Sequence, residues 1–246
     1  DPTKRYYYTL LFGDKYRVKI ATRNVNIPGI QNFRDLGGYP SYPGKKQMRW
    51  GMIYRSAEID SLECYSRREL RNLGIKTLID LRASSETGRQ SPLQKEFNVV
   101  HIPLATGDME NILKGIREEK IKSDTVYRMV EQMNRDLIDK YTTEYRQIFD
   151  ILLDKNSYPV VIHCSSGKGR TGIVSALVLA ALGINEDIIM EDYRLSNDYF
   201  NIPRASKYAY QLPTRSQEAI TTLFSAREDF LNAAKDEAER KYGDMD

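Results

Sequence analysis

The sequence predicts an α/β fold in which a central, mainly parallel β-sheet is flanked by helices. Two observations predict it: short apolar segments of strand composition recur along the chain, and stretches with helical periodicity or capping signals separate most of them. At 246 residues the chain is long enough to bury a full core in one domain. The expected strands cover residues 52–54, 76–80, 99–104 and 158–163.

The longest helical pattern runs from about residue 123 to 154 and contains one break. A shorter helix is expected from Ser66, which could form a capping box with Glu69, to Leu73, with Gly74 as its C-terminal stop. Further helices are expected at about 170–182 and 186–196, and a last pair at about 216–241.

The first 23 residues are expected to form an extension ahead of a domain that covers residues 24–246. Residues 6–12 and 16–22 have strand composition, and a Gly-Asp-Lys turn joins them, which predicts an N-terminal β-hairpin. The tyrosine run could offer a stacking surface for nucleic acid. Ordinary strand composition instead favours a hairpin that packs on the body through one face.

Composition excludes several classes of protein. The net charge of +3, from 37 basic and 34 acidic groups, is too small to predict a nucleic-acid partner. Cys64 and Cys164 lie 100 positions apart and form neither a disulfide framework nor a Cys-x-x-Cys pair. With only two histidines, a zinc site is not expected.

The longest apolar run, residues 172–182, is too short to span a bilayer and too far from the N-terminus to be a signal peptide. No transmembrane segment is therefore expected. The chain begins with Asp1-Pro2 rather than methionine, which indicates a processed or trimmed product. A cytoplasmic location and a secreted or cell-envelope location after removal of a signal both stay open for this soluble chain.

The strongest functional signal is the loop His163-Cys-Ser-Ser-Gly-Lys-Gly-Arg-Thr171, between an apolar strand and an apolar helix. A short loop before a helix N-terminus turns successive backbone N–H groups inward and makes a nest for an anion such as phosphate. Its glycines permit backbone angles and close approaches that side chains would block. The residues expected to bind the anion are Ser165, Ser166, Gly167, Lys168, Gly169 and Thr171.

Cys164 and Arg170, spaced as Cys-x5-Arg, are the expected catalytic residues. The helix N-terminus and the nearby cations should lower the pKa of the thiol well below its free value of about 8.5, and the thiolate can then form a phosphocysteine. The guanidinium can hold two phosphoryl oxygens, most strongly in the transition state. Thr171 could donate its hydroxyl to the sulfur when that intermediate is cleaved. The pattern predicts a cysteine-dependent phosphatase without a cofactor, whose loop also takes phosphate, sulfate or vanadate.

Three alternatives to this hypothesis exist. A lone cysteine at a strand end is by default a small buried apolar residue, but here the glycines, the arginine and both flanks agree with a nucleophile. Rhodanese-like sulfurtransferases carry a similar Cys-x5-Arg loop, but the continuation Gly-Lys-Gly-Arg-Thr-Gly favours a phosphatase. An inactive phosphate-binding pseudophosphatase would keep the loop and lack a working acid.

The loop matches His-Cys-x-x-Gly-x-x-Arg-Thr-Gly, the active-site signature of the protein tyrosine phosphatase superfamily. Further segments narrow the match: Asn32-Phe-Arg-Asp-Leu-Gly-Gly-Tyr39, Tyr54-Arg-Ser56, Leu73-Gly-Ile75, Ile79-Asp-Leu-Arg82 and Asp192-Tyr-Arg-Leu-Ser-Asn197. Together they resemble the bacterial tyrosine/dual-specificity/phosphoinositide phosphatase family over about residues 24–200. The resemblance implies a dual-specificity-phosphatase-like fold and, as substrate, a phosphotyrosine protein or, as in several members, a phosphoinositide.

Lys168 bears on the choice between these substrates. Lipid-active enzymes of this type share a lysine at its position, where an ammonium could meet additional phosphates on an inositol ring. The alternative is that Lys168 only raises the local potential. Both interpretations stay open.

The general acid is less well defined. Virulence members of the family usually carry Asp between the loop lysine and arginine, but this chain has Gly169 there, so another loop must supply the proton. Asp108, where the superfamily's mobile acid loop falls, is the first candidate, unless it only caps a helix that starts at Met109. Asp80, at the carboxyl end of a strand, is the second, unless it serves as an ion-pair partner of Arg82 or Arg34.

Overall fold

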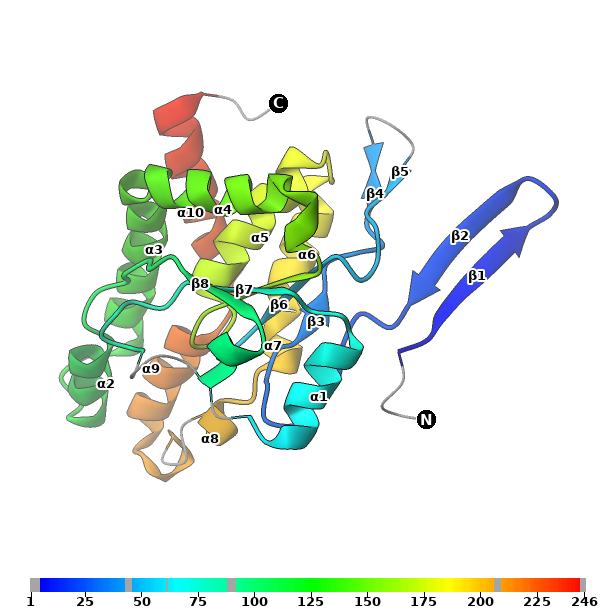
Figure 1. Cartoon of the computed structure of the whole chain (residues 1–246). Helices are drawn as coiled ribbons and strands as arrows, with labels where there is room; N and C mark the ends of the chain where they lie inside the picture. Colours follow the sequence, from blue (N-terminus) through cyan, green and yellow to red (C-terminus); the bar gives the residue numbers. More distant parts are fainter. Residues whose placement is uncertain (1–4, 43–45, 61, 88–91, 206–208, 244–246) are drawn as a thin grey trace.

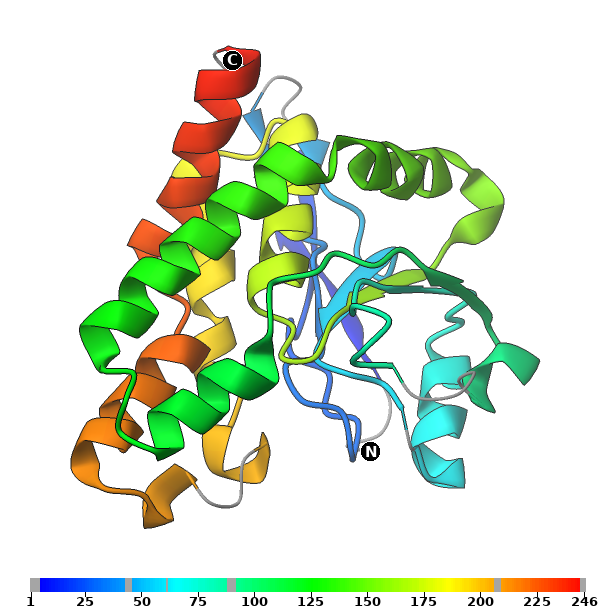
Figure 2. The ribbon, with the colours of Figure 1, turned by 90° about the vertical axis from the view of Figure 1, so that its left-hand side faces the viewer.

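The computed structural model describes residues 5–42, 46–60, 62–87, 92–205 and 209–243. Within these ranges, helices cover both faces of a central β-sheet (Figure 1). Seen from the side, α3 (Ser123–Lys140), α5 (Gly169–Ala181) and α10 (Glu228–Tyr242) lie on one side of the strands and α1 (Cys64–Asn72) on the other (Figure 2). The predicted α/β class is confirmed.

The sheet has five strands in the order β3-β6-β9-β7-β8. β3 runs antiparallel to β6, and every other neighbouring pair is parallel. Ser56, His163 and Asp80 stand at the same level across the three middle strands, so the segments that follow them meet at one edge of the sheet. The bounds are β3 Arg34–Asp35, β6 Ile53–Ser56, β7 Thr77–Asp80, β8 Asn98–His101 and β9 Val160–His163.

Both faces of the middle strands are buried, as the continuous apolar runs predicted. Successive side chains of a strand point to opposite faces of the sheet. Ile53, Ile79 and Ile162 join the core with α5 and α4 (Thr142–Leu153). The residues next to them, Tyr54, Leu78 and Val161, join the core with α1.

A third apolar cluster lies among α2 (Met109–Arg117), α3 and α9 (Thr214–Phe224). The predicted break in the long helical pattern is confirmed, because α3 ends at Lys140 and α4 begins at Thr142. The other described helices are α6 (Glu186–Arg194), α7 (Ser196–Tyr199) and α8 (Ile202–Ala205), and a small two-stranded sheet pairs β4 (Pro40–Ser41) with β5 (Lys46–Gln47).

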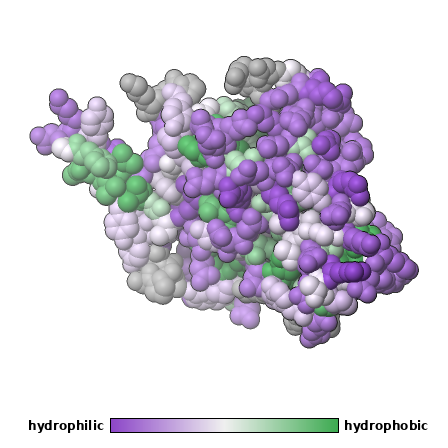
Figure 3. Space-filling model, turned by 180° about the vertical axis from the view of Figure 1, so that it is seen from behind, coloured by the Kyte–Doolittle hydropathy of each residue, from purple (hydrophilic) through white to green (hydrophobic). Residues whose placement is uncertain are grey.

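The predicted N-terminal hairpin is present, as β1 (Tyr7–Phe12) and β2 (Tyr16–Ala21). Contrary to the expectation that one face would pack on the body, the hairpin projects away from it, and its contacts with the body among the described residues lie at its base (Figure 1). There Arg5 pairs with Asp35 at 2.7 Å, and the indole of Trp50 donates to the Lys19 carbonyl at 2.8 Å. The rest of the hairpin leaves apolar side chains at the surface (Figure 3), including Leu10, Phe12 and Tyr16.

None of the helices in the described part of the chain combines the length and the apolar character needed to cross a bilayer.

Candidate active site

The predicted loop lies where the carboxyl edge of the sheet meets the N-terminus of α5. β9 ends at His163, Cys164 follows with 1% of its surface exposed, and α5 begins at Gly169. Arg170 is therefore in the first turn of the helix, and its side chain returns over the loop to contact the Ser165 hydroxyl at 3.1 Å. The structure thus brings the predicted nucleophile and the predicted arginine to the same side of one short loop.

The loop carbonyls are bound from outside the loop. The Ser165 carbonyl accepts from the Glu58 backbone N–H at 3.2 Å, and the Ser166 carbonyl accepts from the Asn32 amide at 3.1 Å. The Gly167 carbonyl accepts from Asn32 at 3.1 Å and from Arg55 at 2.8 Å. Because a peptide unit directs its N–H opposite to its C=O, this arrangement turns the N–H groups of the loop inward. Among the described residues, the backbone N–H groups of 165–168 have no hydrogen-bond acceptor.

Gly167 is required at its position for two reasons. Its φ of +69° lies in the left-handed region, which residues with a Cβ rarely adopt. A Cβ there would also lie 2.4 Å from the Ser56 carbonyl oxygen on the neighbouring strand β6. The loop can approach β6 this closely only without a side chain.

A buried network beneath the loop holds this arrangement. Asp192 accepts from Arg55 at 2.6 Å, from Tyr39 at 3.0 Å and from Arg34 at 3.3 Å, and all of these groups are buried. Burial alone would raise the pKa of Asp192, but the charges of Arg34 and Arg55 outweigh it and lower that pKa to about 2. Arg34 also donates to Asn32, so the two loop-binding residues Asn32 and Arg55 are connected to the same carboxylate. Asp192 therefore has a structural role beneath the loop.

Arg170 forms an ion pair with Glu86, a residue that was not among those predicted from the sequence. One terminal nitrogen of Arg170 donates to Glu86 Oε2 at 2.5 Å and the other to Oε1 at 2.8 Å, while the Ser165 hydroxyl donates to Oε1 at 2.6 Å. Burial would raise the pKa of Glu86, but the hydrogen bonds and charge of Arg170 lower it to about 2. Glu86 therefore fixes the plane of the guanidinium beside the loop.

A cavity of about 290 Å³ opens above the loop and contains Cys164, Lys168 and Arg170 in its lining. Lys168 is 3% exposed, and among the described residues its ammonium has no hydrogen-bond partner. It lies 5.2 Å from the ring centre of Phe200 and 5.1 Å from that of Phe224. Burial lowers the pKa of Lys168 to about 7, although the electrostatic interaction with Cys164 acts to raise it.

The two acids predicted from sequence occupy other positions. Asp108 is exposed and caps α2, where its carboxylate accepts from the Asn111 backbone N–H at 3.0 Å. Asp80 is buried and accepts from the Arg82 side chain at 2.7 and 2.9 Å. Burial would raise the pKa of Asp80, but the bonds from Arg82 hold it below its usual value. Neither residue lines the cavity, although the loop of Asp108 reaches it through Thr106 and Met109. Catalysis by either acid stays a prediction.

The remaining predicted residues lie in the loop as expected. Ser165, Ser166 and Gly169 line the cavity, and Thr171 is fully buried behind it. Among the described residues the Thr171 hydroxyl has no hydrogen-bond partner, so it is free to donate to a nearby acceptor. No group of three or more His, Cys, Asp or Glu side chains in the described ranges could hold a metal ion.

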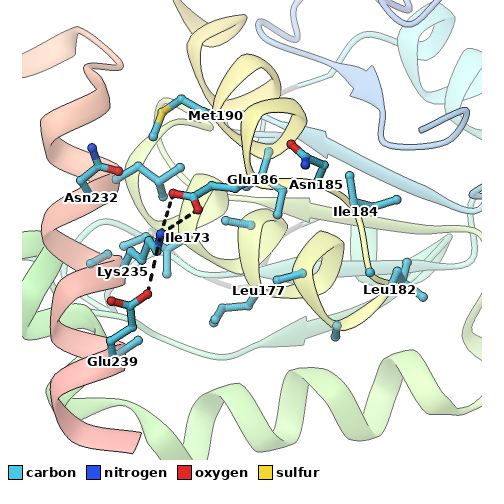
Figure 4. Close-up of a pocket in the computed structure, with 18 of the residues that line it drawn as sticks. Ile173, Leu177, Leu182, Ile184, Asn185, Glu186, Met190, Asn232, Lys235 and Glu239 are labelled. Carbon is cyan, nitrogen blue, oxygen red and sulfur yellow. Dashed lines mark hydrogen bonds and ion pairs between the residues drawn. The ribbon is translucent and has the colours of Figure 1, made fainter. Parts of the chain in front are cut away.

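A larger hollow, of about 850 Å³, lies between α5, α6 and α10 (Figure 4). Ile173 and Leu177 of α5 contribute to its apolar lining, and Lys235 pairs at its rim with Glu186 at 2.7 Å and Glu239 at 3.7 Å. None of the predicted site residues lines it, so it is separate from the loop cavity.

Sequence reasoning missed Glu58 and Glu86. Both follow strands whose carboxyl ends lie at the edge of the sheet that carries the loop, which is where α/β sites collect. The same signal led to Asp80, which is the last residue of β7 and precedes Glu86 in the chain. Both glutamates lie a few residues past a strand end, and that position is the sequence signal that could have identified them.

A cysteine, an arginine and inward N–H groups on one loop at a helix N-terminus are features that cysteine-based phosphatases require. Comparison with known proteins agrees. Residues 25–246 match the model of the tyrosine phosphatase family, and the chain belongs to that family. It is therefore a phosphoric monoester hydrolase of the tyrosine phosphatase type.

Among individual relatives, the triple specificity protein phosphatase PtpB of Mycobacterium tuberculosis is 28% identical over 253 residues, covering 89% of this chain and 90% of PtpB. A putative tyrosine-protein phosphatase of Cupriavidus necator is 26% identical over 223 residues, covering 88% and 79%. The crystal structure of P. aeruginosa TpbA in complex with pTyr matches 72% of this chain and 88% of that one, with 16% identity and a TM-score of 0.34. A likeness at that score supports no detail of this site.

Proposed function

We propose that the chain hydrolyses phosphotyrosine in proteins through a phosphocysteine on Cys164. The thiolate attacks phosphorus, Arg170 and the inward N–H groups of residues 166–168 hold the phosphoryl oxygens, and water then cleaves the S–P bond. Thr171 is proposed to assist that second step by donating its hydroxyl to the departing sulfur. The observation that carries this proposal is the outward binding of the loop carbonyls by Glu58, Asn32 and Arg55, which leaves the N–H groups for an anion.

The proposal is tested with Cys164→Ser and Arg170→Lys. The unaltered enzyme should hydrolyse p-nitrophenyl phosphate and a phosphotyrosine peptide in the presence of a chelator, and vanadate should inhibit it. Cys164→Ser should bind a phosphotyrosine peptide and turn over none, and Arg170→Lys should lose at least about 100-fold in kcat because lysine lacks the planar fork. Full activity of Cys164→Ser would disprove the mechanism, and vanadate binding by the unaltered chain without turnover would favour the inactive phosphate-binding alternative.

A second substrate class, phosphoinositides, is supported by one observation. Lys168 places an ammonium without a hydrogen-bond partner, among the described residues, in the lining of the same cavity as Cys164. An additional phosphate on an inositol ring would supply that partner. Lys168→Ala should then reduce turnover of a phosphoinositide in mixed micelles more than turnover of a phosphotyrosine peptide. Equal losses on both substrates would leave Lys168 with a general electrostatic role.

A further inference from the structure

The reaction needs a proton donor for the leaving oxygen, and the cavity limits the candidates. Among the described residues, the carboxyl groups in its lining are those of Glu58 and Glu86. Asp108 caps α2 and Asp80 is bound to Arg82, so both would have to leave hydrogen bonds to reach a substrate in the cavity. A general acid must lie within hydrogen-bond reach of the leaving group, which favours a residue that already lines the cavity.

Glu86 does not meet the second requirement, which is a proton to donate. Both of its oxygens accept hydrogen bonds from Arg170, and Ser165 and the Ala83 backbone N–H add two more. These interactions favour the carboxylate form. A group that is ionised at neutral pH and held in this way serves to position Arg170 and not to protonate a substrate.

Glu58 meets the first requirement, and its surroundings act in the direction of the second. It lies two residues beyond the end of β6, and its backbone N–H binds the Ser165 carbonyl at 3.2 Å, which fixes its position relative to Cys164. Its side chain is 61% exposed, and the only cation within 4 Å of its carboxylate among the described residues is Arg82, at 3.8 Å. Arg82 is shared with Asp80 and Asp60, which it contacts at 2.7 and 2.5 Å. The carboxyl of Glu58 is therefore free to turn toward a bound substrate.

The electrostatic surroundings of Glu58 shift its pKa upward. The groups that act on it are Asp60, Glu86 and Asp80, which are negative, and Arg82, which is positive. Partial burial at the cavity wall and these carboxylates raise the pKa of Glu58, and Arg82 opposes them. This is the direction in which the pKa of a carboxyl that acts as a general acid is shifted.

We propose that Glu58 is the general acid of the hydrolysis described above, an inference that rests on the proposed function. In the first step the sulfur of Cys164 forms a bond to phosphorus, the bond from phosphorus to the tyrosine oxygen breaks, and that oxygen takes the proton of Glu58. In the second step the Glu58 carboxylate accepts a proton from water, the water oxygen bonds to phosphorus, and the S–P bond breaks to return the thiolate. Protons and electron pairs balance over the two steps.

The leaving group provides the test. p-Nitrophenolate leaves readily without a proton, whereas the tyrosine phenol, with a pKa of about 10, does not. Glu58→Gln should therefore lower kcat for a phosphotyrosine peptide by about 100-fold or more and kcat for p-nitrophenyl phosphate by less than about 10-fold. The alkaline limb of the kcat/KM profile for the peptide should also disappear. Glu58→Asp should recover part of the loss, and Glu186→Gln, at the separate hollow, should match the unaltered enzyme.

Two results would overturn the proposal. One is an equal loss on both substrates in Glu58→Gln, which would indicate a structural role, and urea unfolding of the variant checks that its fold is retained. The other is a leaving-group-dependent loss in Asp108→Asn or Asp80→Asn instead. Neither result would touch the role of Cys164, because phosphocysteine formation is measured separately by trapping the intermediate with p-nitrophenyl phosphate after rapid acid quenching.

Discussion

Glu86 offers the sharpest test of how the site is held together. The perturbation is Glu86→Gln, which keeps the shape of the side chain and removes its charge. In the folded chain the carboxylate binds both terminal nitrogens of Arg170 and the Ser165 hydroxyl. Its side chain is only 26% exposed, so solvent screens the pair much less than it screens a surface ion pair. The substitution should therefore destabilise the fold measurably.

The magnitude follows from the titration of Glu86. Its pKa falls from 4.5 to about 2 on folding, which corresponds to about 3 kcal/mol of favourable interaction with the carboxylate form. A carboxyl whose pKa is depressed in the folded state stabilises it above the unfolded pKa and loses that contribution as the pH falls toward the folded one. We expect Glu86→Gln to lose about 3 kcal/mol at pH 7 and only about 1 kcal/mol at pH 3.

Urea unfolding of both proteins at pH 7, 4 and 3, followed by circular dichroism, measures this difference. Glu186→Gln is the matched control, because Glu186 pairs with Lys235 at the surface with 60% of its side chain exposed, and it should cost less than about 1 kcal/mol. An unchanged urea midpoint of Glu86→Gln at pH 7 would show that the Glu86–Arg170 pair does not stabilise the fold. A difference that grows toward acid pH would refute the reasoning, since the sign of the linkage would then be reversed.

Three further predictions concern the surroundings of the loop. Asp192→Asn leaves the buried charges of Arg34 and Arg55 without a counter-charge, so the free energy of unfolding should fall by about 3–5 kcal/mol. Calorimetry should show Tm lowered by about 10 °C or more, and a shift of under 2 °C would contradict a stabilising role of the network. Gly167 has φ at +69°, and a Cβ there would meet the Ser56 carbonyl, so Gly167→Ala should weaken vanadate inhibition by about 100-fold while the far-ultraviolet circular dichroism spectrum stays the same. Unchanged inhibition would show that the loop tolerates a Cβ. Lys168→Met removes a buried ammonium and should raise the free energy of unfolding by about 1–3 kcal/mol below pH 7. That gain should shrink as the pH rises from about 7 toward 10.5, because the folded chain has then already lost the proton that the unfolded chain still holds, and urea titrations at pH 6 and 9 decide it.

Elements with a strong local pattern were predictable from sequence. The strand before Cys164 and the break near Tyr141 follow from apolar periodicity, and Gly74, with φ at +73°, ends α1 as its position indicated. The expected capping box at Ser66 was wrong: α1 begins at Cys64, and the Ser66 hydroxyl donates to the Pro28 carbonyl instead. A hydroxyl with a tertiary partner loses its capping role, and the local sequence does not contain that information.

The placement of Cys164 and Arg170 together was predictable for a similar reason, since they lie six positions apart in one continuous stretch of sequence, and their catalytic roles stay predictions. The residues that orient them were not, because their positions depend on the paths of other loops. Glu86 reaches Arg170 across 84 positions of sequence, and Asn32 reaches Gly167 across 135. Periodicity carries no signal for such contacts, and only the order of the strands in the sheet brings them together.

That order also explains why two distant motifs behave as one physical unit. The segment around Asn32 and Arg34 lies beside β6, which pairs with β9, so it meets the underside of the loop that β9 leads into. Asn32 from this segment and Arg55 from β6 bind the loop carbonyls, and Asp192 from α6 pairs with Arg34 and Arg55. The N–H groups that we propose to bind the anion are thus fixed before any substrate arrives, so that little reorganisation would remain to be done in the transition state. Substitutions in this underside network should consequently reduce kcat even though none of its side chains lines the cavity.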